Sequence, residues 1–249
     1  MIRVVDPAEY TDPYLETYTQ VPKAGPGVCR VCHGGPNDDY AICFSCGHTM
    51  SQVTFPTELV VPISLYRIPG QLHHVLRNYK NGPAATVLRN QVAATLARFV
   101  GLHRGCVERA LEATIDAVMT VPSTRLPLRT GVHPLQRAVQ QVSSLNELHR
   151  TGLRRGPAPV GHLLANDRAF SVETDVSGLT ILLVDDTFTS GARAQSAASA
   201  LVFSDAARVS VLTVGRVIDP TYNDNCQRIW RWARRRPFDF SVCCLEESS

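Results

Sequence analysis

Near-continuous apolar runs alternate with helical patterns along this chain from about residue 58 onward. Apolar runs that end in glycine, proline or charged residues are typical of strands buried on both faces. Between them, apolar residues recur three and four positions apart, which predicts helices. The predicted strands are 58–68, 116–121, 180–184 and 208–218, and the predicted helices are 71–82, 84–111 (one long helix or two broken ones), 134–149 and 192–203. This alternation predicts an α/β fold with a mainly parallel sheet covered by helices on both faces.

The same pattern divides the chain into three parts. Residues 1–28 show no sustained period and predict an N-terminal arm, residues 29–50 carry closely spaced cysteines, and residues 55–249 hold the alternating strands and helices. Residues 150–170 are rich in glycine, proline and arginine, so we expect mostly loop there. Residues 123–168 contain seven arginines and only two acidic residues. That excess suits either a cationic flap over an anionic ligand or a solvated loop.

Two adjacent carboxylates follow the third predicted strand, in the stretch ILLVDDTFTSGAR. Neighbouring side chains of a strand point to opposite faces, so we expect Asp185 and Asp186 to lie where the strand ends and the backbone turns. Open α/β sheets bind their ligands at this carboxyl edge. Carboxylates accept hydrogen bonds, which suits a ribose diol or a divalent cation. The alternatives are a solvated acidic turn and the acidic pocket of a response regulator.

The loop after the carboxylates has the composition of an anion-binding turn. Thr187, Thr189 and Ser190 supply hydroxyl groups. Gly191 permits close backbone approach, and the following helix presents free N–H groups. Arg193 falls in the first turn of that helix, where a cation is unfavourable by about 0.3–1 kcal/mol unless an anion binds. Carboxylates beside such a loop predict a site for a ribose 5-phosphate.

Two C-x-x-C pairs lie within residues 29–50. Thiolates two residues apart on a tight turn can bind one Zn²⁺ together, so the spacing predicts a structural zinc ribbon, with redox or inert thiols as the alternative. We expect His33 and His48 to be solvent-exposed neighbours and not ligands. The predicted zinc ligands are Cys29, Cys32, Cys43 and Cys46, and the scattered cysteines are Cys106, Cys226, Cys243 and Cys244.

The stretch ILLVDDTFTSGA resembles the PRPP-binding signature of type I phosphoribosyltransferases, an apolar strand followed by D-D-x-x-[ST]-[ST]-G-A-[ST]. The resemblance implies that Asp185 and Asp186 are catalytic and hold the ribose hydroxyls, while the loop wraps the 5-phosphate. The upstream TVPSTR falls where that family binds pyrophosphate and Mg²⁺. Arg193 is a departure, since the family usually has Thr or Ser there. The further PRPP-binding residues implied are Thr187, Thr189, Ser190, Gly191, Ala192 and Arg193 in the loop, and Ser123, Thr124 and Arg125 upstream.

Cysteine pairs followed by such a domain are similar to the ComF family, which is associated with competence and DNA uptake. The resemblance spans nearly the whole chain and includes LYRIPGQLHHVLRNYKNG and NDRAF, whereas the family's Arg-Gly-Phe-Asn-Gln segment is altered to HPLQRAVQQ. It implies a phosphoribosyltransferase-like sheet with a small N-terminal zinc ribbon. Lys80 matches the family's lysine, and it is either a phosphate ligand or a solvated lysine at a helix end.

Composition and charge add little to these motifs. The 249-residue chain is 44% hydrophobic with a formal net charge of +3, and only Lys23 and Lys80 among its 25 basic residues are lysine. No apolar run approaches the ~18 residues of a membrane span. The first residues lack the apolar stretch of a secretory signal, so we expect a cytoplasmic protein. The segment CQRIWRWARRRP suits single-stranded DNA through phosphate contact and base stacking, or a helix packed through Ile229, Trp230 and Ala233.

Together these features predict an enzyme that binds PRPP with Mg²⁺ and transfers its phosphoribosyl group to a nitrogen acceptor, releasing pyrophosphate. The setting implied is DNA uptake or nucleotide metabolism. The competing hypothesis is a non-catalytic module that senses PRPP, or that binds single-stranded DNA or a DNA-processing protein through the ribbon and the Arg/Trp segment. The sequence specifies neither the acceptor nor the oligomeric state.

Overall fold

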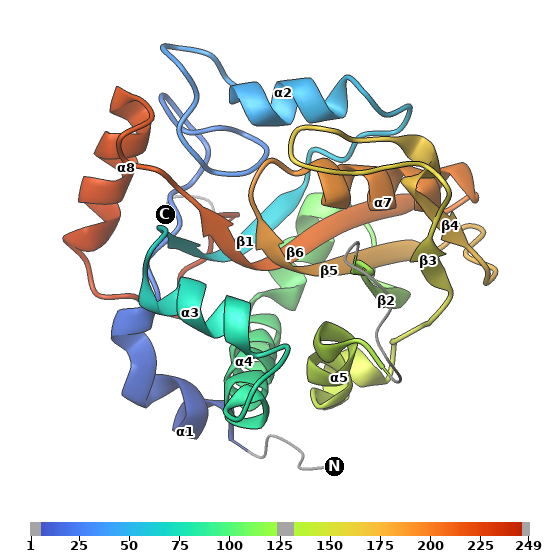
Figure 1. The fold of residues 1–249 in the computed structure, drawn as a ribbon, viewed down its shortest axis with the longest axis horizontal. Coiled ribbons are helices and arrows are strands. Elements are labelled where there is room, and N and C mark those ends of the chain that lie inside the picture. Colours follow the sequence, from blue (N-terminus) through green and yellow to red (C-terminus); the bar gives the residue numbers. More distant parts are fainter. Residues whose placement is uncertain (1–5, 124–131, 246–249) are drawn as a thin grey trace.

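Four parallel strands form the central sheet, in the order β1–β6–β5–β2 (Figure 1). The computed structural model describes residues 6–123 and 132–245. Strand β5 lies in the middle, and Val184 pairs with Leu212 of β6 and with Thr120 of β2. The strands are β1 (Val60–Tyr66), β2 (Ala117–Thr120), β5 (Thr180–Phe188) and β6 (Arg208–Val217). The predicted parallel sheet is therefore confirmed.

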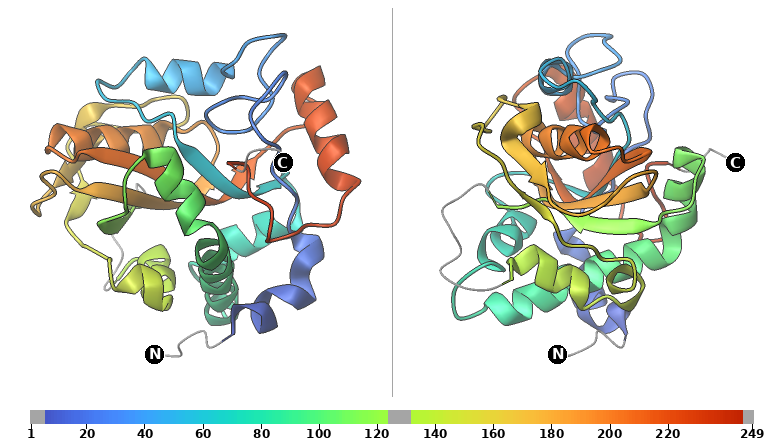
Figure 2. Two further views of the ribbon diagram at one scale, coloured as in Figure 1. Left: turned by 180° about the vertical axis from the view of Figure 1, so that it is seen from behind. Right: turned by 90° about the vertical axis from the view of Figure 1, so that its right-hand side faces the viewer.

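Helices cover both faces of this sheet, which gives three layers (Figures 1 and 2). Alternate residues of β5 enter two separate apolar clusters: Leu182 and Val184 pack with α4, and Ile181 and Leu183 pack with α7. This alternation explains why the strands are apolar throughout. The helices are α1 (Pro7–Thr11), α2 (Phe44–Met50), α3 (Gln71–Asn78), α4 (Ala85–Leu111), α5 (Pro134–Gln140), α6 (Ser143–Asn146), α7 (Ala192–Phe203) and α8 (Asp224–Arg234), with 3₁₀ turns η1 (Asp12–Thr17) and η2 (Asp167–Ala169). Among the described residues, no helix is both long and apolar enough to cross a membrane.

Several predicted boundaries change in the structure. The predicted helix 84–111 is one unbroken helix, α4, over Ala85–Leu111, which ends where Glu112 turns left-handed at φ 51°. The predicted helix 134–149 is wrong in its continuity, because the buried Val142 is extended and separates α5 from α6. The expectation of loop over 150–170 misses β3 (Leu153–Arg155), which pairs antiparallel with β4 (Phe170–Val172).

The N-terminal arm joins the core of the domain. The Leu65 N–H donates to the Thr19 carbonyl at 2.9 Å, and the Thr19 N–H donates to the Ser64 hydroxyl at 2.8 Å, so the arm runs beside β1. Tyr18 is 4% exposed, and its hydroxyl lies 2.7 Å from that of Thr95 on α4. The arm therefore stabilises the outer edge of the sheet next to β1.

Helix α7 is fixed by polar side chains that contact the segment before β1 and the turn η2. Gln195 is fully buried, accepts a hydrogen bond from the Thr57 N–H at 2.9 Å and donates to the Thr57 carbonyl at 2.8 Å. One turn later, Ser199 donates to Asp167 at 2.6 Å, and Asp167 also accepts from Thr54. These bonds fix α7 against the segment before β1 and against η2.

We expect Gln195→Met to lower the free energy of unfolding by about 2–4 kcal/mol, because it leaves both backbone groups of Thr57 buried and unpaired. Chemical denaturation measures this loss. Gln227→Met on the exposed side of α8 is the matched control and should change stability little. Equal effects of the two substitutions would contradict the role given to Gln195.

Candidate functional site

The acidic pair lies within β5 and not after it. The strand continues through Asp185 and Asp186 to Phe188, so the prediction that the strand ends at the pair is wrong. The neighbouring strand β2 stops at Thr120, opposite Val184, so among the described residues no strand pairs with Asp185 and Asp186 on that side. The Asp185 carboxylate accepts from the Asp186 N–H at 2.9 Å. Both side chains are at most 2% exposed, which excludes a solvated acidic turn.

Two cations and a phenol surround the pair. Arg193 Nη2 lies 2.7 Å from Asp185 Oδ1 and 3.8 Å from Asp186 Oδ1, so one guanidinium connects both carboxylates. Lys80 forms an ion pair with Asp186 Oδ2. Tyr79 donates its hydroxyl to the same oxygen at 2.9 Å. The carboxylates therefore share one charged environment, although they are neighbours on a strand.

Burial and charge shift the two carboxyl groups in opposite directions. Loss of water raises the pKa of Asp185 to about 7, although Arg193 opposes the shift. Burial also disfavours ionised Asp186, but Lys80 and Arg193 more than offset this effect and lower its pKa. The pair thus combines a carboxyl group whose pKa is lowered with one whose pKa is raised to about 7.

The loop that connects β5 to α7 is shaped for close approach to its backbone. Gly191 is left-handed at φ 86°, and a Cβ there would lie 2.5 Å from the Phe188 ring, so glycine is required on two grounds. Among the hydrogen bonds between described residues, none is donated by the backbone N–H groups of residues 190–193. These groups open the 12-residue helix α7, whose N-terminal end carries partial positive charge. The loop can therefore bind an anion.

The other predicted loop residues differ in their surroundings. Ser190 faces inward: its hydroxyl accepts from the Leu163 N–H at 3.2 Å, and its carbonyl accepts from the Thr49 hydroxyl at 3.3 Å. Thr189 is exposed and Thr187 is half-buried. Arg193 reaches back to the carboxylates, which compensate its charge at the helix start. Thr124 and Arg125 lie outside the described residues.

A cavity of about 700 Å³ brings these groups together, a size in the usual range for small-molecule sites. His133, at the altered HPLQRAVQQ segment, lines it, and burial together with the Lys80 charge lowers the pKa of His133 to about 4. Sequence reasoning gave no role to His133 or Tyr79; the available signal was that Tyr79 adjoins Lys80. In the described part of residues 123–168, no arginine lines the cavity, so the cationic flap is not seen there. Predicted residues along the cavity wall are Lys80, Ser123, Asp185, Asp186, Thr187, Thr189, Ser190, Gly191, Ala192 and Arg193.

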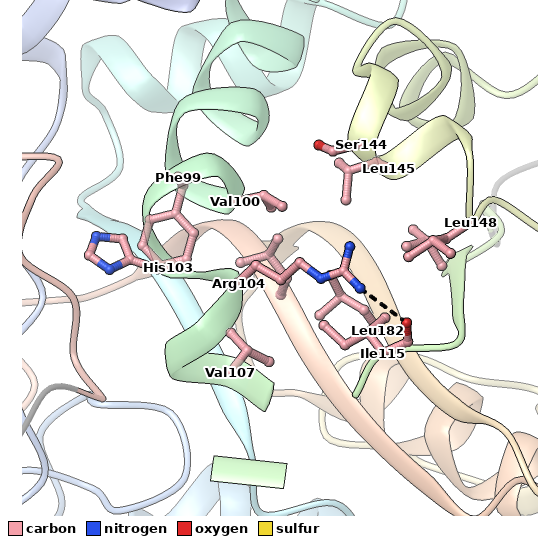
Figure 3. A pocket seen from close by; sticks show the side chains of 12 residues that line it. Phe99, Val100, His103, Arg104, Val107, Ile115, Ser144, Leu145, Leu148 and Leu182 are labelled. Carbon is pink, nitrogen blue, oxygen red and sulfur yellow. Dashed lines mark hydrogen bonds between the residues drawn. The ribbon is translucent and has the colours of Figure 1, made fainter. Parts of the chain in front are cut away.

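A second, apolar cavity of about 10 Å³ lies between α4, α6 and the sheet (Figure 3). It is lined mainly by Phe99, Leu145 and Leu182, and Arg104 crosses it to donate to the Ile115 carbonyl at 3.3 Å. This volume admits at most one water molecule. The cavity is therefore a packing gap and not a ligand site.

The four predicted cysteines converge on one point. Their sulfur atoms lie within 4.8 Å of one another, and all four residues are buried. The Sγ atoms of Cys32 and Cys43 are 3.7 Å apart, close to the edge of about 3.8 Å that a tetrahedron with Zn–S bonds of about 2.3 Å requires. The sulfurs of Cys29 and Cys32 raise the pKa of the Cys43 and Cys46 thiols, a shift that a divalent cation would reverse. The cluster can hold a structural metal such as zinc.

Two expectations about this module need correction. Residues 29–50 are all described and form no strand; the second cysteine pair opens helix α2 instead of a β-ribbon. His33 is buried and not exposed: it is 3% accessible, its Nδ1 lies 2.9 Å from the Pro22 carbonyl, and burial lowers its pKa. His48 is exposed as expected, and neither histidine belongs to the metal-type cluster.

Arg216 connects the cysteine cluster to the loop of the cavity. It is 9% exposed, and its guanidinium lies 5.6 Å from the centre of the Phe188 ring that supports Gly191. Burial opposes its charge, but the negative charge on Cys32, Cys43 and Cys46 more than compensates and raises the pKa of Arg216. A side chain on Gly34 would collide with this guanidinium. Arg216 therefore lies where it can neutralise part of the charge of four thiolates.

No model of a known protein family matches the chain, and a search of curated proteins found no match. What the site can do therefore follows from its residues and geometry.

The raised pKa of Asp185 should make the free energy of unfolding depend on pH. Between the unfolded value of 3.8 and the folded value of about 7, the folded chain holds a proton that the unfolded chain has released. The free energy of unfolding attributable to Asp185 should therefore fall as pH rises from about 4 to about 7. Buried histidines with a lowered pKa make the free energy of unfolding rise with pH in part of this range. The difference in this free energy between wild type and Asp185→Asn, taken at each pH, isolates the contribution of Asp185. A pH-independent difference would contradict the raised pKa.

Arg216→Gln should weaken zinc binding by about 10–100-fold, because it removes the cation that stabilises the thiolates. Competition with a chromophoric chelator measures the affinity. Arg154→Gln, which alters an exposed arginine paired with Glu173, is the matched control and should leave the affinity unchanged. Unchanged affinity in Arg216→Gln would show that the thiolates need no such compensation.

Proposed function

We propose that this protein is a phosphoribosyltransferase that binds PRPP with Mg²⁺ in the 700 Å³ cavity and transfers the phosphoribosyl group to a nitrogen acceptor. One observation carries the proposal: the adjacent carboxylates line the same cavity as the start of α7, whose first N–H groups donate no hydrogen bond to any described residue. Acceptors for a sugar diol beside donors for a phosphate match a ribose 5-phosphate.

Different residues bind the chemically different parts of the ligand. Asp185 and Asp186 accept hydrogen bonds from the ribose hydroxyls, and the N–H groups of residues 190–193 hold the 5-phosphate with Thr187 and Thr189. Arg193 and Lys80 already lie at the carboxylates and need only rotate to reach anionic oxygens. When the ribose binds, its hydroxyls replace Arg193 and Lys80 as hydrogen-bond donors to the two carboxylates. The two cations then pair with phosphate oxygens of the ligand.

The reaction breaks the bond between the anomeric carbon and the pyrophosphate oxygen, and the electron pair leaves with pyrophosphate. A nitrogen lone pair of the acceptor forms the new bond, and the nitrogen loses a proton. Asp185, whose pKa is raised to about 7, is suited to accept that proton. When bound with PRPP, Mg²⁺ supplies charge neutralisation for the leaving group. Ser123 lines the same cavity, and we assign it to the pyrophosphate.

The four-cysteine cluster completes the proposal as a structural zinc site, giving the organisation expected of a ComF-like protein. Thr49 of α2 donates to the Ser190 carbonyl, so the metal module contacts the phosphate loop directly. Zinc would hold this contact without taking part in the reaction.

A second candidate function is the binding of single-stranded DNA, with PRPP sensed and not consumed. The observation that favours it is that arginines are exposed along α8 and just after it. Among them, Arg236 lies 5.0 Å from the centre of the Trp232 ring. The apolar side of α8 packs on the core through Ile229 and Ala233, and Trp230 is only partly buried. The predicted packing role of this segment is thus confirmed, and its arginines remain available on the outside.

Calorimetric titration of PRPP with Mg²⁺ tests the proposal. We expect saturable binding to the wild type and at least about 100-fold weaker binding to Asp185→Asn/Asp186→Asn, because charge-assisted hydrogen bonds contribute about 1.5–3 kcal/mol each. Inorganic pyrophosphate should bind the double variant at least as well as the wild type, since Lys80 and Arg193 are then released. Asp175→Asn, on the exposed surface, is the matched control.

Equal PRPP affinity of wild type and double variant would refute ribose recognition by the pair. PRPP binding without turnover of any nitrogen base would support the sensing alternative, as would a DNA complex that salt weakens and the double substitution leaves intact.

A further inference from the structure

A second cluster of metal-type ligands lies where α4 meets the C-terminal segment. His103 and Cys106 come from α4, and Cys243 comes from the chain after α8. One ligand atom of each residue lies within 4.8 Å of the others, and His103 Nδ1 is 3.7 Å from Cys106 Sγ. None of these residues lines the large cavity or belongs to the four-cysteine cluster.

The histidine is oriented as a metal ligand. His103 is 2% exposed, and its Nε2 lies 2.7 Å from the Phe240 carbonyl. A carbonyl oxygen only accepts hydrogen bonds, so in the neutral ring Nε2 carries the proton and Nδ1 presents its lone pair toward the sulfur of Cys106. Metal-bound histidines characteristically donate their other ring nitrogen in this way. In Figure 3 the His103 ring lies on the side of α4 away from Leu145 and Leu148, although the residue also helps to line the small apolar cavity.

The local folds place the three ligands without help from a metal. His103 and Cys106 are three residues apart and share one face of α4. The C-terminal segment is held independently, since Gln20 donates to the Val242 carbonyl at 3.0 Å and the Val242 N–H donates to the Asp239 carbonyl at 3.3 Å. Cys243 therefore reaches α4 through contacts that lie outside the cluster.

Both sulfurs have donors that favour a thiolate. The Leu245 N–H donates to Cys243 Sγ at 3.4 Å, and Arg109 Nη2 lies 3.7 Å from Cys106 Sγ. Charge-assisted contacts of this kind stabilise the deprotonated sulfur that a metal requires. Cys106 is only half-buried, so solvent can reach the cluster from its side.

We infer that His103 Nδ1, Cys106 Sγ and Cys243 Sγ form a second zinc site. One imidazole nitrogen with two thiolates is a donor set that Zn²⁺ favours, and three protein ligands leave a fourth position for water. Zn²⁺ displaces the two thiol protons into solvent and its charge balances the two thiolates. The site links the C-terminal segment to α4, on the opposite side of the sheet from the four-cysteine cluster.

Metal content of the full-length protein, purified under reducing and oxygen-free conditions, tests this inference. We expect two zinc ions per chain in the wild type and one in Cys106→Ser and in Cys243→Ser. His103→Gln is a further ligand variant in case a serine variant does not fold, and circular dichroism checks folding in each case. Cys244→Ala is the matched control, because Cys244 is buried beside the site but outside the cluster, and it should retain two ions.

Cobalt substitution identifies the ligands. The wild-type spectrum minus that of Cys106→Ser should show the visible bands of a tetrahedral ion with two thiolates, besides those of the four-thiolate site. One zinc ion per wild-type chain would overturn the inference, and so would two ions in all folded ligand variants. A Cys106–Cys243 disulfide in the reduced preparation would also overturn it.

Discussion

The site depends on the balance of four buried or half-buried charges at the open edge of β5. Asp185 and Asp186 are almost inaccessible to water, and they are ionisable there because Arg193 and Lys80 lie against them. Removing one partner from such a group typically costs about 3–5 kcal/mol, because the remaining charge stays buried. A ligand that offers hydroxyls to the acids and oxygens to the cations can replace these ion pairs without leaving any charge unpaired.

The fold is organised around that edge. β2 ends before the acidic pair, Gly191 turns the chain tightly over Phe188, and α7 is fixed by Gln195. Two contacts join the cysteine module to the same loop: Thr49 donates to the Ser190 carbonyl, and Arg216 lies over the Phe188 ring. A metal held by the four cysteines would therefore support the loop as well as its own module.

Much of this arrangement could be predicted from the sequence, because buried parallel strands and C-x-x-C pairs leave strong local patterns. The strands, α7 and the four cysteines follow from such patterns. Contacts between distant segments leave none: Tyr79 reaches Asp186 and His133 reaches the cavity through tertiary packing, and Cys243 meets α4 only after the chain has folded. The strand continues through the acidic pair because β5 stays paired with β6, where Asp185 lies opposite Thr213 and Phe188 opposite Arg216, and residue spacing does not reveal this long-range pairing.

The most direct test of this account is a crystal structure of the complex with PRPP and Mg²⁺. We expect ribose hydroxyls within hydrogen-bonding distance of Asp185 and Asp186, the 5-phosphate on the N–H groups of residues 190–193, and Arg193 turned from the carboxylates toward the ligand. Intact ion pairs between Arg193, Lys80 and the acids, with PRPP bound elsewhere or not at all, would contradict it.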